Sequence, residues 1–139
     1  MASLSHAAGD DDPTLTGFYR LSGSNRDLVE AKRPDEGSPW SEDPSIAGLN
    51  TGAGERSPCL SPDELEVYFG SDRASPTADV HDLFVATRAG LGEPFASPRP
   101  IAELNTASDE DDAWISPDGR ILYFSSDRSG NAEIYQSRR

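Results

Sequence analysis

Two runs of acidic residues are the part of this sequence best suited to chemistry. They lie at 10–12 and 109–112, at equivalent places of an internal repeat. Calcium binds several carboxylate and carbonyl oxygens, so converging loops could form a site for a cation or a basic ligand. The residues concerned would be Asp11, Asp12, Asp111 and Asp112. We favour the other interpretation, solvated loop carboxylates, because the middle repeat has Gly-Glu-Arg-Ser at 54–57 instead.

Two aromatic residues, Trp40 and Phe95, occupy the same position of the repeat. One interpretation is that they stack on a ligand such as a sugar ring. An aromatic residue kept at one position of a repeat is more simply explained by packing between neighbouring units. We therefore expect packing first and ligand stacking second.

The remaining reactive side chains show no catalytic arrangement. His6 and His81 lie in unlike places, and we expect both at the surface without a role. The only cysteine, Cys59, is expected to be a buried, inert thiol. The repeated aspartates could form the carboxylate pair of a glycosidase. We expect Asp63 and Asp118 instead to stabilise their turns by hydrogen bonds from side chain to backbone. The sequence thus favours a protein that is not an enzyme and binds no cofactor, with calcium as the alternative.

These residues belong to a repeat with an offset of 55 residues. Residues 27–73 and 82–128 share 20 identities in 47 positions. The shared motifs include Ser-Pro-Asp at 61–63 and 116–118, Tyr-Phe at 68–69 and 123–124, and Ser-Asp-Arg at 71–73 and 126–128. Repeats of about this period are typical of propellers and other repeat arrays.

Each unit contains short strand signals separated by turns rich in Gly, Pro, Ser and Asp. We expect a single all-β domain over 1–139, made of about three four-stranded antiparallel β-propeller blades, the last without its outer strand. The approximate units are 4–48, 49–103 and 104–139. The expected strands are 13–16, 18–23, 27–32 and 45–50, then 57–61, 65–71, 82–87 and 100–105, then 113–116, 120–126 and 132–137.

The motif order Ser-Pro-Asp, Tyr-Phe, Ser-Asp-Arg, glycine turn and Ile-Tyr resembles the WD-like propeller repeat of the TolB type. The resemblance implies a propeller that binds a protein on one face of its ring, often in the cell envelope. The second unit departs from the pattern, because Glu64 replaces the turn glycine found at Gly119 and the connection over 74–81 is longer.

The amino-acid composition limits the classes of partner that the protein could bind. With 12 basic and 25 acidic residues the net charge is −13, which argues against nucleic acid or an anionic membrane as partner. No apolar run reaches the length of a membrane span. The first six residues do not resemble a signal peptide. The sequence alone thus favours the cytoplasm, the resemblance favours the periplasm or envelope, and the compartment stays open.

The unfinished third unit suggests how the protein could assemble. Residues 3–6 read as the tail of an outer strand, which could complete the third blade of a second copy. Two chains would then form a six-bladed head-to-tail homodimer. The alternatives are a piece of a longer propeller and an open monomer. For function we expect a non-enzymatic module that binds a protein partner or itself. The alternatives are the propeller part of a larger peptidase or glycosidase, and a propeller that binds carbohydrate or cations.

Overall fold

A computed structural model of the chain describes residues 2–3, 15–20, 26–77 and 79–139. These residues form three antiparallel sheets with one short 3-10 helix, η1. The first sheet contains β1 (Ala2–Ser3), β2 (Leu15–Arg20), β3 (Leu28–Arg33) and β4 (Ser41–Asp43), followed by η1 (Pro44–Leu49). The second contains β5 (Glu55–Leu60), β6 (Glu66–Ser71), β7 (Asp82–Thr87) and β8 (Ala96–Pro100), and the third β9 (Glu110–Ile115), β10 (Ile121–Ser126) and β11 (Glu133–Arg138).

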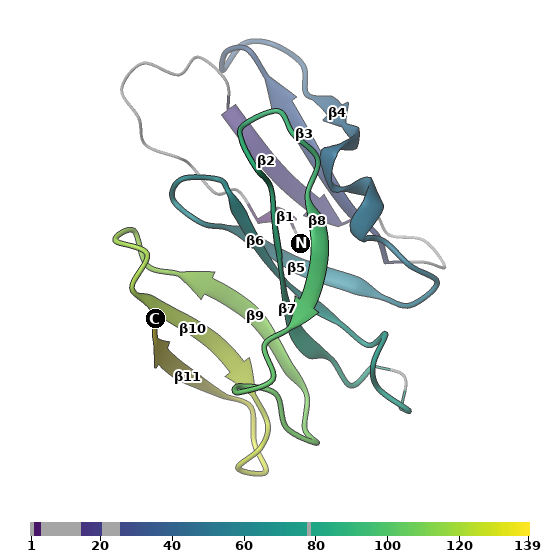
Figure 1. Cartoon of the computed structure of the whole chain (residues 1–139), viewed down its shortest axis with the longest axis vertical. Helices are drawn as coiled ribbons and strands as arrows, with labels where there is room; N and C mark the ends of the chain where they lie inside the picture. The colour runs from purple at the N-terminus through teal and green to yellow at the C-terminus, as the bar shows by residue number, and fades with distance from the viewer. Residues whose placement is uncertain (1, 4–14, 21–25, 78) are drawn as a thin grey trace.

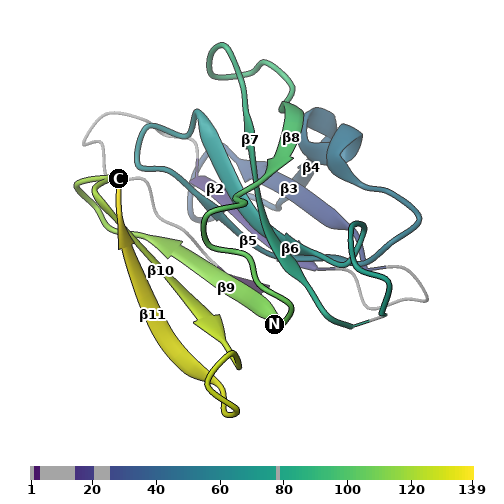
Figure 2. The ribbon, with the colours of Figure 1, turned by 60° about the horizontal axis from the view of Figure 1, so that its bottom comes forward.

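Strands that follow one another in the chain lie side by side in each sheet. The sheets themselves succeed one another across the molecule, as Figure 1 and Figure 2 both show, with β11 at the outer edge of the third sheet. This is the arrangement of propeller blades. The predicted all-β fold of two four-stranded blades and one three-stranded blade is confirmed for the described residues.

Tight turns between the first two strands of a blade explain the Ser-Pro-Asp motif. In the third sheet the Asp118 carboxylate accepts hydrogen bonds from Ser116 Oγ at 2.5 Å and from the Arg120 backbone N–H at 3.1 Å. Gly119 has a positive φ of 70°. In the second sheet Glu64 takes that conformation with φ 58°, which L-residues rarely adopt. The repeated motif therefore builds turns.

Two apolar cores hold the sheets together. Each lies between neighbouring sheets and combines one face of each, as in stacked blades. Between the first and second sheets lie Leu28, Ile46, Leu49, Leu60, Val67, Phe69, Phe84, Ala86 and Phe95. Between the second and third lie Cys59, Tyr68, Leu83, Val85, Ile101, Ala113, Ile115, Leu122 and Phe124. Cys59 is buried, as expected, and burial raises the pKa of its thiol.

The outer strands of the first and second units were predicted too late in the sequence. Strand β4 ends at Asp43, whose carboxylate accepts the Ser45 backbone N–H at 2.8 Å and caps η1. Pro44 occupies the first turn of that helix, where its missing N–H costs nothing. Residues 45–49 are therefore helical and send Ile46 and Leu49 into the core. In the second sheet β8 ends at Pro100, so residues 101–105 are likewise not a strand.

The prediction for the N-terminal residues was also wrong. Ala2–Ser3 pairs with β2, at Tyr19 and Phe18, and so occupies the innermost position of the first sheet. It is not the tail of an outer strand. Residues 15–16, expected to end the inner strand, open β2 instead. The expected strand at 13–16 otherwise lies outside the described residues.

Candidate functional site

Two fully buried glutamates organise the ends of the inner strands. Glu110 Oε1 accepts hydrogen bonds from Thr106 Oγ1 at 2.7 Å, Ser126 Oγ at 2.7 Å and Arg128 Nη2 at 3.2 Å. Its Oε2 accepts the Thr106 backbone N–H at 2.7 Å. Glu55 makes the same set with the equivalent residues of the second sheet, namely Thr51, Ser71 and Arg73.

This network is architectural, because it joins the inner strand to the second strand of the same blade. Arg128 Nη2 also donates to the Leu104 carbonyl at 2.6 Å, and Arg73 Nη2 does so to Leu49 at 2.6 Å. The serine and the arginine of each Ser-Asp-Arg motif thus both hydrogen-bond to a buried glutamate carboxylate. Sequence analysis missed both glutamates, although their identity at an offset of 55 was the signal.

The acidic run at 109–112 is bound within the chain. Asp109 Oδ1 accepts the His81 backbone N–H at 2.7 Å and lies 2.9 Å from His81 Nδ1. Arg56 Nη2 lies 3.3 Å from Asp109 Oδ2, and Arg56 Nε forms an ion pair with Asp111. Burial raises the pKa of Asp111, and the Arg56 charge opposes that rise. Asp112 is exposed and accepts Ser57 Oγ at 2.8 Å.

Asp112 and Ser57 mark matching irregularities in β9 and β5. Both have a φ of 51°, and both lie where the pairing register of the inner strand shifts. The described part of the chain contains no group of three or more His, Cys, Asp or Glu side chains placed to hold a metal ion. Asp11 and Asp12 lie outside the described residues, so their convergence with Asp111 and Asp112, the less favoured interpretation, is not tested.

The prediction of a surface histidine was wrong for His81. Its side chain is fully buried at the junction of the second and third sheets, where its backbone N–H and its ring both contact Asp109. Its Nε2 has no hydrogen-bond partner among the described residues. His6 lies outside them.

The two aromatic residues lie in equivalent settings but differ in exposure. Phe95 is 3% exposed and belongs to the core between the first and second sheets, with the Arg88 guanidinium 4.4 Å from its ring centre. The Arg33 guanidinium likewise lies 4.6 Å from the ring centre of Trp40, but Trp40 is 39% exposed. Phe95 is therefore a packing residue in this structure, while Trp40 is accessible at the surface.

The outward face of the third sheet exposes large apolar side chains. Ile134 is 73% exposed and Trp114 51%, and Trp114 packs beside Tyr123 with ring centres 5.7 Å apart. The repeat equates Trp114 with Cys59 and Tyr123 with Tyr68. The strand registers equate Ile134 with Leu83, because Ser125 pairs with Ile134 as Gly70 pairs with Leu83.

In the second sheet all three equivalent positions are buried beneath the third sheet. We call Trp114, Tyr123 and Ile134 the open face. The open face is thus the surface that receives the next blade elsewhere in the same chain, here without a blade among the described residues. It has the apolar character of an interface.

The third sheet also has an unpaired edge. In the second sheet β7 pairs with β6 on one side and β8 on the other. Its equivalent β11 pairs with β10, and no strand of the described part of the chain pairs with its other edge. Unpaired backbone N–H and C=O groups at such an edge can add a strand.

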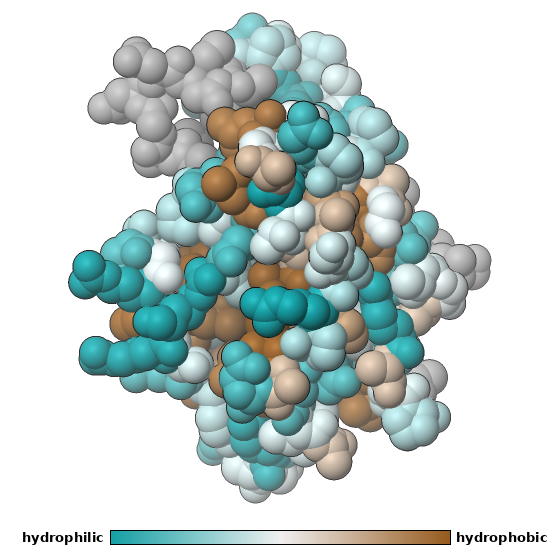
Figure 3. Space-filling view, viewed as in Figure 1, coloured by the Kyte–Doolittle hydropathy of each residue, from teal (hydrophilic) through white to brown (hydrophobic). Residues whose placement is uncertain are grey.

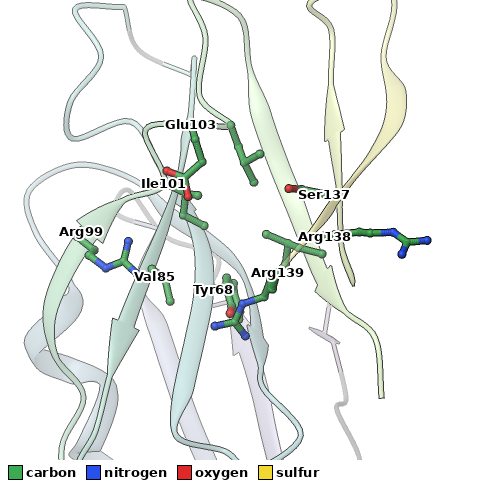
Figure 4. Close-up of a pocket in the computed structure, with 10 residues that line it drawn as sticks. Tyr68, Val85, Arg99, Ile101, Glu103, Ser137, Arg138 and Arg139 are labelled. Carbon is green, nitrogen blue, oxygen red and sulfur yellow. The ribbon is translucent and has the colours of Figure 1, made fainter. Parts of the chain in front are cut away.

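A pocket of about 200 Å³ lies between the second and third sheets, near the end of β11. Figure 4 shows Arg99 and Ile101 on one side and Ser137 and Arg139 on the other. Arg139 Nη1 pairs with Glu66 Oε2 at 2.8 Å. Apolar surface lies between these sheets in Figure 3, bordered by hydrophilic side chains.

Comparison with known proteins supports the fold alone. No family model matches the sequence, and no curated protein matches it. Eleven solved chains match its structure. One of them, from Agrobacterium tumefaciens and assigned as TolB, is 18% identical with a TM-score of 0.58. The match covers 92% of this chain and 39% of that one, so this chain spans well under half of the solved protein. No helix in the described residues is long and apolar enough to cross a membrane.

Proposed function

We propose that this chain is a non-enzymatic interaction module that binds a protein surface through the open face of its third sheet. The observation that carries the proposal is the contrast between equivalent positions. Leu83 is fully buried and Ile134 is 73% exposed, although both occupy the same place on a blade. The TolB-like neighbour supports a propeller, a fold that hosts many functions. The repeated carboxylates support a structural use, because they hydrogen-bond within turns and strand clamps.

The partner with the best complementarity is the first sheet of a second copy. At the junction of the first and second sheets, Arg88 Nη1 lies 3.7 Å from Glu30 Oε1, and Phe95 enters the core. The repeat places Arg33 and Trp40 on the first sheet where the second has Arg88 and Phe95. Among the described residues of the first sheet, Arg33 and Trp40 thus offer the kind of side chains that the open face would receive.

Head-to-tail contact of two copies would place six blades in one assembly, within the usual range for propellers. This form of the homodimer needs no exchange of the N-terminal strand, which pairs within its own sheet. The buried core between blades would be repeated across the contact, with Ile134 in the role of Leu83.

The test is sedimentation velocity of the chain over a range of concentrations. Ile134→Lys places a charge at the centre of the open face, so we expect the wild type to form dimers and the variant to remain monomeric. Leu91→Lys is the matched control, because Leu91 is also exposed, at 62%, but lies in the β7–β8 connection. A wild type that stays monomeric, or equal masses for all three proteins, would refute self-association through this face.

A further inference from the structure

The junction of the first and second sheets shows how a blade is locked at its rim. Phe95, directly before β8, is buried in the same core cluster as Ile46, Leu49, Val67 and Ala86, which we call its seat. The Arg88 guanidinium covers the ring. The Phe95 backbone N–H donates to the Ser45 carbonyl of the neighbouring blade at 2.9 Å. An aromatic residue at the start of an outer strand thus fastens that strand to the blade before it.

The junction of the second and third sheets contains the walls of the same seat. The repeat and the strand registers equate Ile101, Leu104, Leu122 and Ser137 with those four residues. Arg139 takes the place of Arg88. Arg88 N donates to the Leu65 carbonyl at 2.9 Å and Arg139 N to the equivalent Arg120 carbonyl at 2.9 Å, so both leave their strand in the same way.

All five equivalent residues line the pocket of about 200 Å³. A cavity of about 150 Å³ can hold benzene, so this volume is large enough for one aromatic ring. The pocket differs from a core cavity because it is open to solvent and has charged residues in its lining. The position of the ring at the first junction is occupied by Phe95, whereas at the second junction it is an open pocket beside the unpaired edge of β11.

We propose that an extended peptide segment of a protein partner pairs with the free edge of β11 and places an aromatic side chain in this pocket, beneath Arg139. This inference goes beyond the proposed function, since it adds a second protein contact that lies outside the open face. Strand addition supplies backbone hydrogen bonds, and the pocket supplies selectivity for the aromatic residue. The guanidinium over the ring adds a cation–π contact, as Arg88 does over Phe95.

The pocket lining contains the acidic Glu103 as well as arginines. The residue that would follow the aromatic lies nearest to one of these arginines. In the second sheet Ala96, which follows Phe95, lies opposite Thr87. Thr87 corresponds to Arg138 in the third sheet, because Glu66 pairs with Thr87 as Ile121 pairs with Arg138. Arg99 also lines the pocket, and neither Arg99 nor Arg138 forms an ion pair among the described residues. An acidic residue after the aromatic therefore suits this edge.

A fluorescein-labelled peptide with the sequence of residues 93–105, EPFASPRPIAELN, serves as the probe, and fluorescence polarisation measures its binding to the full chain. It carries the aromatic residue and outer strand that the first junction accommodates. We expect saturable binding that weakens by roughly 10- to 150-fold in a Phe95→Ala peptide, because the ring leaves the apolar walls formed by Ile101, Leu104 and Leu122. An Ala96→Asp peptide should bind roughly 1.4- to 5-fold more tightly through Arg138. Equal binding of the Phe and Ala peptides would overturn the proposal.

A pair of variants at one position tests the pocket itself. Ser137→Phe fills the pocket and should abolish peptide binding. Ser137→Ala introduces the residue that the second sheet has there, Ala86, and should leave binding within about twofold. Arg139→Ala, which leaves the apolar walls intact, should weaken binding several-fold and gives an independent readout if Ser137→Phe does not fold. Unchanged binding by both Ser137→Phe, shown to be folded by circular dichroism, and Arg139→Ala would contradict the assignment.

The peptide assay on Ile134→Lys separates this inference from the proposed function, because Ile134 lies on the open face and outside the pocket. We expect the variant to lose self-association and to keep peptide binding. Dimerisation of the wild type without peptide binding would overturn the proposed peptide site at β11 and leave the proposed function standing. Peptide binding by a wild type that does not self-associate would support the peptide site at β11 and overturn only self-association through the open face.

Discussion

The carboxylate of Glu110 should be one of the most important polar groups for stability. In Glu110→Gln the amide oxygen can keep the three contacts of Oε1, but the amide nitrogen then faces the Thr106 backbone N–H, donor against donor. One hydrogen bond to a charged group is lost, at about 1.5–3 kcal/mol, and Arg128 loses its counter-charge. We expect the free energy of unfolding to fall by about 3 kcal/mol in total, and by about 3–5 kcal/mol in Glu110→Ala.

Thermal unfolding followed by circular dichroism measures this effect. For a chain of this size about 3 kcal/mol corresponds to a fall in Tm of roughly 10 °C. Glu93→Gln is the control, since Glu93 is exposed and its substitution should stay within about 0.5 kcal/mol. A fall in Tm of less than about 2 °C in Glu110→Gln would show that the buried network does not clamp the inner strand, and would refute the reasoning.

Three other predictions concern packing, acid stability and thiol reactivity. Gly70→Ala should destabilise the fold by about 1–3 kcal/mol in urea unfolding, because a Cβ there would overlap the Asp111 carboxylate, while Gly90→Ala meets no atom within 4 Å and should be neutral. Hydrogen bonds from Ser61 Oγ and the Leu65 N–H lower the pKa of Asp63 in the folded state. Its contribution to stability is thus present above the ordinary Asp pKa of about 3.9 and lost as the pH falls through the lowered value. The Tm difference between wild type and Asp63→Asn should therefore shrink from pH 5 to pH 2.5, and a constant difference would contradict this. Cys59 should resist Ellman's reagent in the native protein and react fully in guanidinium chloride, and rapid native labelling would show that the core between the second and third sheets opens readily.

The repeat made most of the fold predictable. The identities at an offset of 55 allowed the turn at Asp118 and the strands with aromatic residues to be predicted. The order of these strands and turns then indicated propeller blades. The outer strands were misplaced because Ile46 and Ile101 read as apolar strand residues. Their burial comes instead from turns that follow short strands, capped in the first blade by Asp43. Local sequence does not distinguish a buried strand from a buried turn when both carry one apolar residue into the core.

The candidate site was harder to predict because its contacts join different blades. The acidic run at 109–112 reads as solvated from its own neighbours, yet Arg56 and His81 of the second blade bind it. The alignment of Trp114 with Cys59 was visible in the sequence. Trp114 is exposed and Cys59 is buried because, in the described part of the chain, a further sheet packs on that face of the second sheet but not of the third. Sequence spacing does not show which sheet faces are covered.

The most direct test of the account is a charge exchange across the proposed contact between two copies. The strand registers equate Gln136 with Val85 and so, through the repeat, with Glu30, which faces Arg88 at the first junction. In a head-to-tail dimer Gln136 of one copy should therefore face Arg33 of the other.

The measurement is the dimer dissociation constant, from sedimentation equilibrium, of Gln136→Arg, Arg33→Glu and the double variant. The account predicts that Gln136→Arg weakens the dimer by like-charge repulsion. Combining it with Arg33→Glu should restore affinity beyond that of either single variant. Additive losses in the double variant, or no self-association by any of the proteins, would contradict the claim that the open face of one copy receives the first sheet of another.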